Sequence, residues 1–377
     1  MLRFRRRIKQ LILSAGHSSK TLTAPRTMPN ARQTITRDDG RTAEASAPVV
    51  LSASRRTDIP AFYADWFMGR LARGYCAWRN PFSGRQSFVS FENVRFVVFW
   101  SKNPKPLLKH LPELRRRGIG VMVHFTLNDY ASEGLEPQLA SWQDRIDTFR
   151  RLSDALGPDA VLWRNDPLVL TPELTMDRLL GKWTRTADAL TGFTDTSIVS
   201  FADIADYRKV RNNLVRHGID TLEWSEDAMR AFGAKLSAAN RALPGGGFTL
   251  STCAETVDLS AYGITHGRCV DHERILRVAL RQVPDRCSAL LEALGGRFDP
   301  ADAETPLPAR RILLKPKKDP GQRPACGCHA AKDIGQYDTC PHLCRYCYAN
   351  AKPETVLRNW KTHCAAPAAE GLLGDAP

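Results

Sequence analysis

The stretch Arg95-Phe-Val-Val-Phe-Trp-Ser-Lys-Asn-Pro104 contains the structural unit that the chain repeats. Its apolar run, Arg95–Trp100, ends at a polar cluster, and a helical pattern starts at Pro104. Short apolar runs without alternation are typical of strands that are buried on both faces. We therefore expect the polar cluster at the carboxyl end of a buried strand.

The same unit recurs along residues 48–362. Further strands are predicted at Val49–Ala53, Gly120–Phe125, Ala160–Trp163, Ser197–Phe201 and Phe248–Thr252. Helices are predicted between them, at Ala61–Arg73, Pro104–Arg117, Leu139–Leu156, Thr171–Leu190 and Glu226–Leu243. Alternating strands and helices predict an α/β fold with a parallel sheet, as a full or partial (β/α) barrel. An open doubly wound sheet is the structural alternative.

Both ends of the chain are predicted to be disordered tails, residues 1–47 and 363–377. Residues 1–47 are rich in Arg, Ser, Thr and Ala and lack a sustained apolar period. Their composition is also that of a transit peptide, and a start site at Met28 is a further alternative. Residues 1–37 hold nine Lys or Arg and no acidic residue, so the other 340 residues carry only +5 of the formal charge of +14.

Composition excludes several classes of protein. The 377 residues are 43% hydrophobic and 25% charged, which is normal for a folded globular protein. No apolar run approaches the about 20 residues that a membrane-spanning helix needs. We expect a cytoplasmic protein without a membrane partner. The nearly neutral body gives little support to nucleic-acid binding.

Charged side chains follow most of the predicted strands. They are Arg55, Arg56, Asp58, Lys102, Arg164, Asp166 and Glu255. The active site of a (β/α) barrel lies at the carboxyl ends of its strands. Acidic and small polar residues there can simply cap helices and form turns, but capping does not require Arg or Lys. The basic residues therefore predict a cationic rim, suited to the carboxylate or phosphate of an anionic substrate.

Five of the ten cysteines lie between Cys326 and Cys347. The run Cys340-Pro-His-Leu-Cys344-Arg-Tyr-Cys347 has a C-x3-C-x2-C spacing. Three thiolates on a short loop can hold three irons of a 4Fe-4S cluster and leave the fourth iron open. The spacing alone also fits zinc, because Cys326-Gly-Cys328-His329 lies just upstream. Disulfides are disfavoured, since the chain carries no secretory signal.

This run, with Tyr346 before its last cysteine, resembles the cluster motif of the radical S-adenosylmethionine (SAM) superfamily. The layout of residues 48–362, from Ser52–Pro60 through Trp100–Pro104 to Cys347–Asn350, resembles the domain-of-unknown-function family numbered 1848. The superfamily resemblance implies a 4Fe-4S cluster on Cys340, Cys344 and Cys347, reductive cleavage of SAM and a reducing electron donor. It also implies a (β/α) barrel that is circularly permuted, because the motif lies near the C-terminus of this chain.

Within that resemblance, the residues at the strand ends and Tyr346 become candidates for cofactor binding. Arg55, Arg56, Lys102 and Arg164 can bind the SAM carboxylate or an anionic substrate. Asp58, Asp166 and Glu255 can bind the SAM amino group or its ribose hydroxyls.

A second group of cysteines is formed by Cys253, Cys269, Cys326 and Cys328. Four thiolates can hold zinc or an auxiliary iron–sulfur cluster. Alternatively, Cys253 is a small buried hydrophobe at the end of a strand.

Two hypotheses follow for the barrel domain, residues 48–362, with its cysteine-rich region 326–350. The first is a radical SAM-type enzyme acting on an unknown small-molecule or macromolecular substrate. The second is a structural zinc protein that interacts with nucleic acid or protein. The enzyme hypothesis requires the loop of Cys340 to face the strand ends that carry Arg55, Lys102 and Arg164.

Overall fold

The centre of the molecule is an eight-stranded sheet, seen in a computed structural model that describes residues 31–302, 312–315 and 317–374. Its strand order is β11-β10-β9-β8-β7-β6-β3-β14, and every pairing is parallel. The strands are β3 (Val50–Ala53), β6 (Phe96–Ser101), β7 (Gly120–Thr126), β8 (Val161–Leu168), β9 (Thr196–Phe201), β10 (Thr249–Thr252), β11 (Thr265–His266) and β14 (Lys332–Asp333). The six predicted strands and the α/β class are confirmed.

The helices alternate with these strands. They are α2 (Ile59–Phe62), α3 (Ala64–Arg73), α4 (Leu111–Arg116), α5 (Trp142–Leu156), α6 (Met176–Leu190), α7 (Arg208–Arg216), α8 (Glu226–Ala242), α9 (His272–Gln282), α10 (Cys287–Ala293) and α11 (Pro353–Ala365). The segment predicted as one helix over Pro104–Arg117 begins as a 3-10 helix, Lys105–His110, before α4. Pro112, which lacks an N–H donor, stands in the first turn of α4 and favours this break. Among the described residues, no helix is long and apolar enough to span a membrane.

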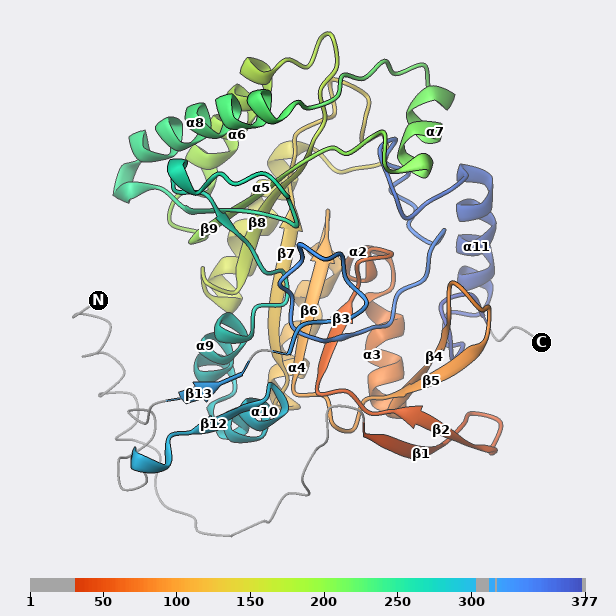
Figure 1. The fold of residues 1–377 in the computed structure, drawn as a ribbon. Helices are drawn as coiled ribbons and strands as arrows, with labels where there is room; N and C mark the ends of the chain where they lie inside the picture. Colours follow the sequence, from red (N-terminus) through yellow and green to blue (C-terminus); the bar gives the residue numbers. More distant parts are fainter. Residues whose placement is uncertain (1–30, 303–311, 316, 375–377) are drawn as a thin grey trace.

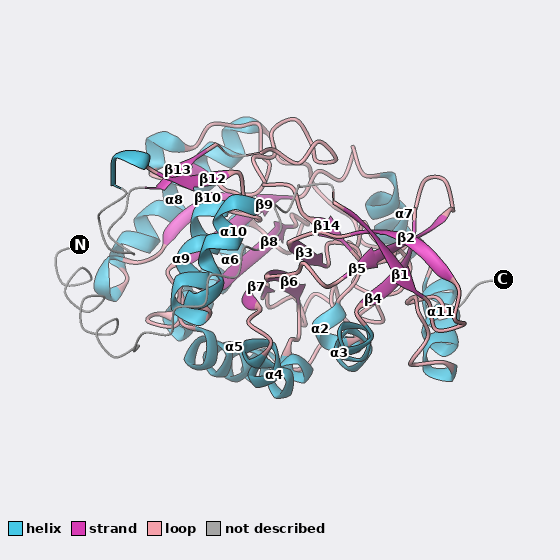
Figure 2. Cartoon of the chain, turned by 90° about the horizontal axis from the view of Figure 1, so that it is seen from below, coloured by secondary structure: helices cyan, strands magenta, loops and turns pink. Residues whose placement is uncertain are grey.

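The strand order distinguishes the two predicted architectures. From β3 to β11, each successive strand of the sheet lies on the same side of the strand before it. In a doubly wound sheet, the order of addition reverses direction part-way along the chain. The alternative of a doubly wound sheet is therefore wrong. Figure 2 shows β7, β6 and β3 along an arc, with α5, α4, α2 and α3 outside it.

The sheet is open within the described part of the chain, so the expected full barrel is not formed. Its edge strands, β11 and β14, are only two residues long and do not pair with each other. Their neighbouring segments do meet, since the His329 N–H donates to the Val270 carbonyl at 2.9 Å. The two edges therefore approach each other without a continuous ladder.

The amino ends of the strands are covered by helix α9. The Gln282 side chain accepts from the Val121 N–H at 2.8 Å and donates to the Val121 carbonyl at 3.1 Å. Figure 1 shows α9 at the opposite end of the strands from α7. Only the carboxyl ends are thus left for the loops that carry the predicted site.

The prediction of a disordered N-terminal tail is wrong for residues 32–46, and residues 1–30 lie outside the described residues. Strands β1 (Arg32–Thr36) and β2 (Thr42–Ser46) form a hairpin. With β4 (Tyr75–Arg79) and β5 (Gln86–Ser90) they form a second sheet, in the order β1-β2-β5-β4. Ile35 and Ala45 pack on Tyr75 in a small apolar cluster. The sequence of residues 32–46 is short and mostly polar, so it does not reveal this packing.

The prediction of a disordered tail from residue 363 is also wrong through residue 374. Helix α11 continues to Ala365, and Glu370 beyond it is only 2% exposed. The Glu370 carboxylate accepts hydrogen bonds from Arg37, Tyr75 and the Asp38 N–H. This carboxylate joins the C-terminal segment to the N-terminal hairpin. Two more strands, β12 (Gly296–Phe298) and β13 (Ile312–Leu314), pair elsewhere as an antiparallel ribbon.

We expect Glu370→Gln to lower the free energy of unfolding at pH 7 by about 1–3 kcal/mol, because buried donors lose a charged acceptor. Urea denaturation measures this difference. Glu292→Gln, at an exposed position of α10, is the matched control and is expected to change stability by less than about 0.5 kcal/mol. Equal effects of the two variants would contradict the anchoring role of Glu370.

The difference in free energy of unfolding between the wild type and Glu370→Gln should depend on pH. Burial tends to raise the pKa of Glu370, but hydrogen bonds from Tyr75 and Arg37 outweigh it and hold the pKa below its ordinary value. A lowered carboxyl pKa stabilises the fold above the pKa of the unfolded chain. The difference between the wild type and Glu370→Gln should therefore shrink as the pH falls below about 4.

Candidate functional site at the carboxyl ends of the strands

The loop of Cys340, Cys344 and Cys347 lies over the carboxyl ends of the strands. Lys102, the first residue after β6, donates from Nζ to the Tyr346 hydroxyl at 2.8 Å. His342 Nε2 lies 2.9 Å from the carboxylate of Asp58, just ahead of α2. Figure 1 shows the chain ahead of α11 running beside α7. Of the strand ends that the enzyme hypothesis requires the loop to face, those of Lys102 and Arg55 contact it, through Tyr346 and Tyr348. Within the described part of the chain, Arg164 forms no hydrogen bond with the loop.

Helix α7 fixes the last part of the loop. The Asn213 amide donates to the carbonyl oxygens of Cys347 and Asn350, at 3.1 and 2.9 Å. The Asn350 amide in turn donates to the Cys340 carbonyl at 2.8 Å. The side-chain amides of Asn213 and Asn350 therefore hold the backbone of the loop.

Three thiols on one loop are the donor set that the predicted iron–sulfur cluster requires. Cys340, Cys344 and Cys347 are buried or half-buried, and their thiols interact electrostatically with one another. Burial raises the pKa of all three thiols. The Ala349 N–H donates to Cys347 Sγ at 3.3 Å. Hydrogen bonds to sulfur and shielding from solvent are the features by which proteins tune such clusters.

A buried charge network lies directly beside the loop. Lys102 Nζ is 2.8 Å from a Glu136 carboxylate oxygen, which also accepts from the Tyr346 hydroxyl. Arg145 Nη1 lies 3.6 Å from the other oxygen of Glu136. Burial tends to lower the pKa of Lys102, but Glu136 outweighs it and raises the pKa. Two cations thus share one carboxylate next to Cys344.

Sequence analysis missed Glu136 and Arg145. Glu136 lies between β7 and α5, and Arg145 is in the first turns of α5, so neither directly follows a strand. Glu136 and Arg145 are 3% and 1% exposed. Full burial of two charged residues is the feature that identifies them, and it becomes visible only in the folded chain.

Several buried polar atoms around the loop lack a hydrogen-bond partner. They are Arg145 Nε and Nη1, Glu136 Oε2, His342 Nδ1, Arg345 Nε and Asn350 Oδ1. Each such atom costs free energy when it is buried without a partner. Other such atoms lie elsewhere in the described residues, so these six mark positions where a polar ligand would supply hydrogen bonds without singling out the loop.

Two of the predicted rim residues stabilise the fold itself. Asp58 caps α2 by accepting from the Ala61 N–H at 3.0 Å, and it also accepts from the Lys102 N–H at 2.7 Å. The Arg56 guanidinium lies 3.3 Å from the Asp333 carboxylate of β14. The capping role considered for Asp58 is therefore confirmed, and a cofactor role for either residue stays a prediction.

Arg164 and Asp166 lie inside β8, which continues past its predicted end at Trp163, and Glu255 follows β10; all three are nearer the second cysteine group. Arg164 pairs with Asp166, which also accepts a hydrogen bond from Ser200. Glu255 accepts from the Phe201 N–H at 3.0 Å. Burial raises the pKa of Glu255 to about 8. The loop of Cys340 contacts none of these three side chains through a hydrogen bond, so their predicted SAM contacts stay untested.

An aromatic stack connects the two cysteine groups. The Arg55 guanidinium lies 4.8 Å from the ring centroid of Trp100, which stacks on His124 at 5.0 Å. His124 Nε2 is 2.7 Å from the Cys269 carbonyl oxygen. At the other end, the Tyr348 hydroxyl donates to the Arg55 carbonyl. A chain of pairwise contacts through Arg55, Trp100 and the buried His124 therefore connects the two cysteine groups.

The structure brings the second cysteine group together, as the sequence predicts. Cys253 Sγ and Cys269 Sγ lie 3.5 Å apart, and the Cys269 N–H donates to Cys328 Sγ at 3.1 Å. Cys326 and Cys328 share a thiol hydrogen bond. Among the described residues, no three or more Cys, His, Asp or Glu side chains are arranged so that they could hold a metal ion, and the metal content of both groups stays a prediction.

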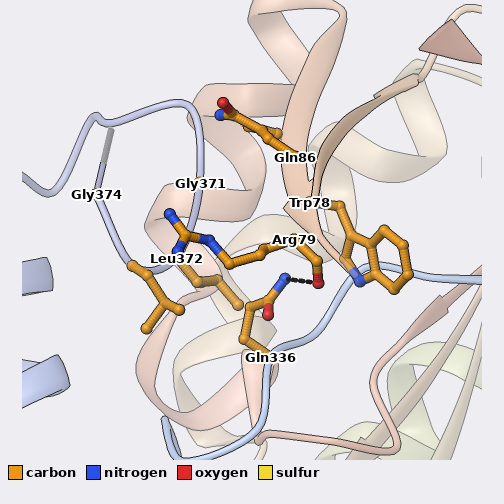
Figure 3. Close-up of a pocket in the computed structure, with 9 residues that line it drawn as sticks. Trp78, Arg79, Gln86, Gln336, Gly371, Leu372 and Gly374 are labelled. Carbon is orange, nitrogen blue, oxygen red and sulfur yellow. Dashed lines mark hydrogen bonds between the residues drawn. The ribbon is translucent and has the colours of Figure 1, made fainter. Parts of the chain in front are cut away.

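Two hollows lie away from this site. One, of about 20 Å³, separates Trp78 and Arg79 from the C-terminal residues 371–374, where Gln336 donates to the Arg79 carbonyl at 3.0 Å (Figure 3). It has room for about one water molecule. The other, of about 510 Å³, is an open groove between α3 and α11. Neither contains a predicted site residue.

Fold and site together define an α/β protein with a singly wound parallel sheet and a three-cysteine loop over its strand ends. The chain belongs to the family described as Domain of unknown function (DUF1848), whose model matches residues 50–349. No curated protein and no solved structure matches the chain. Because the family description names no activity, the function has to be argued from the site.

We expect Tyr346→Phe to lower the free energy of unfolding by about 1–3 kcal/mol, since Lys102, Asn128 and Glu136 all lose a buried partner. Hydrogen exchange of residues 340–350 should accelerate in the same variant. Tyr337→Phe, a half-buried position on the same segment, is the control and should leave both quantities nearly unchanged. Identical exchange rates in the two variants would show that Tyr346 does not anchor the loop.

Proposed function

We propose that this protein is a radical SAM-type iron–sulfur enzyme. In this proposal Cys340, Cys344 and Cys347 hold a 4Fe-4S cluster, and SAM is cleaved reductively with an electron from an external donor. The observation that carries the proposal is the position of the cysteine loop, at the carboxyl ends of parallel strands and beside a buried charge network. Active sites of (β/α) folds occupy that end of the sheet.

The order of the strands supports the expected permutation. Strand β14 is late in the chain, but it forms one edge of the sheet beside β3. The cysteine loop and helix α11 follow β14 directly. Counted across the sheet from this edge, the cysteine loop therefore follows the first strand, β14. Along the chain, β14 is the last strand of this sheet.

The residues of this chain have distinct roles in the proposed site. When bound, the cluster would supply the electron for cleavage of SAM. Arg145 has no hydrogen-bond partner at Nε, its Nη1 lies 3.6 Å from Glu136, and it acts electrostatically on Cys344, so we assign it to the SAM carboxylate. Lys102 and Glu136 fix Tyr346 and so hold the loop in place. Burial of the loop limits the access of water to a reactive species.

The zinc hypothesis for the same loop has less support. An interaction module would present its cysteine loop on the outer helical layer or on a strongly basic surface. Here the loop packs on strand ends, and the body of the chain carries only a small part of the formal net charge of +14. We retain zinc for the second cysteine group only, where two sulfurs lie 3.5 Å apart.

Anaerobic reconstitution with iron and sulfide tests the proposal. The wild type is expected to gain about four iron and four sulfide per loop cluster and to form 5′-deoxyadenosine from SAM and dithionite. Single Ala variants of Cys340, Cys344 and Cys347 should lose the nucleoside product completely. Cys364→Ala, an exposed position on α11, should behave like the wild type. Product formation at the normal rate in the loop variants would exclude this ligand assignment.

A second experiment tests the role of Arg145. In the reconstituted protein, Arg145→Gln should weaken SAM binding about tenfold or more, because a bidentate contact to a carboxylate is lost. Arg145→Lys, which keeps the charge, should recover part of the affinity. Iron content checks that the cluster itself is intact in both variants. Unchanged SAM affinity in Arg145→Gln would show that a different cation binds the SAM carboxylate.

A further inference from the structure

We propose that Cys253, Cys269, Cys326 and Cys328 bind one zinc ion in a tetrahedral tetrathiolate site, and that this ion joins the two edges of the open sheet. The proposal does not depend on the loop of Cys340 or on any reaction of SAM. It assigns the second cysteine group a structural role.

The four cysteines come from opposite edges of the sheet. Cys253 directly follows β10, and Cys269 follows the edge strand β11. Cys326 and Cys328 precede β14, which is the other edge strand. In the described part of the chain, β11 and β14 are not paired with each other. A metal ion held by all four thiolates would link these edges where backbone pairing does not.

The spacing of the sulfur atoms favours a single ion. Zinc–sulfur bonds of about 2.3 Å in a tetrahedron place two sulfurs about 3.8 Å apart. The observed separation between Cys253 Sγ and Cys269 Sγ is 3.5 Å. A 4Fe-4S cluster binds each thiolate to a different iron and holds the sulfurs much farther apart. The geometry therefore favours zinc over an auxiliary 4Fe-4S cluster.

The contacts continue beyond this first pair of sulfurs. Cys269 is hydrogen-bonded to Cys328, and the thiol of Cys328 is hydrogen-bonded to that of Cys326. A disulfide would join only two of the four thiols, whereas a tetrahedral ion uses all of them. Cys269, Cys326 and Cys328 are each less than 10% exposed, which is the shielding expected of a closed structural site.

The surroundings match the charge of such a site. Four thiolates and Zn²⁺ carry a formal charge of −2, which is costly to bury without compensation. Arg164 Nη1 lies 3.0 Å from Cys269 Sγ, and this arginine is 5% exposed. Arg55 acts electrostatically on Cys269 and Cys328. Two cations thus stand in the outer shell, where such groups orient metal ligands and tune the site.

The test uses the full chain with Cys340, Cys344 and Cys347 all changed to Ala, purified without added metal. Elemental analysis should find about one zinc per chain and little iron. Adding Cys269→Ser or Cys328→Ser should lower the zinc content more than tenfold. Adding Cys364→Ser should leave it unchanged. Because this background cannot bind the loop cluster, the result is independent of the proposed SAM chemistry.

A measurement on the chain with all its cysteines guards against variants that fail to fold. Titration with a mercurial reagent should release one zinc as about four thiols react. Three outcomes would overturn the proposal: no bound zinc, iron with acid-labile sulfide in the background that lacks the loop cysteines, or a Cys253–Cys269 disulfide in peptide maps of the freshly purified protein.

Discussion

The parallel pairing of β14 with β3 is the constraint on which the candidate site depends. Asp333 of β14 accepts hydrogen bonds from Ser52 Oγ, Ser54 Oγ and the Arg55 N–H, at 2.7, 2.9 and 2.9 Å. These bonds, with the ion pair to Arg56, fix a strand that is only two residues long. Because parallel strands end at the same edge, the chain that follows β14 necessarily begins at the carboxyl ends of the sheet. The hydrogen bonds of the Asp333 carboxylate therefore position the cysteine loop at that edge of the sheet.

The charges beside the loop are not explained by stability alone. Burying Lys102, Glu136 and Arg145 removes three charges from water, and an apolar cluster of the same volume would usually be as stable or more so. The network also leaves donors of Arg145 unpaired. A fold retains such an arrangement at a cost, which is the usual condition of a binding site. The same residues anchor Tyr346, so that the position of the loop and the local charge are coupled.

The two cysteine groups differ in the physical environment of their sulfurs. Cys340, Cys344 and Cys347 lie on one short loop, which α7 and strand-end residues hold through its backbone and through Tyr346 and His342. Cys253 and Cys269 follow the neighbouring strands β10 and β11 and lie close to each other, with Arg164 beside them, while Cys326 and Cys328 precede β14 at the other edge. A short loop can present a cluster to a substrate, whereas the second group brings together two distant parts of the chain.

The sequence by itself determined the six main strands and both cysteine groups. Runs such as Phe96–Ser101 are buried on both faces, and local apolarity reports that burial directly. Spacing alone placed Cys340, Cys344 and Cys347 on one loop. Only the tertiary structure decided that the sheet stays open, that residues 32–46 form a hairpin, and that Glu136 and Arg145 belong to the site. These features depend on contacts between distant segments, and the free energy of such contacts comes from burial and charge pairing that no local pattern records.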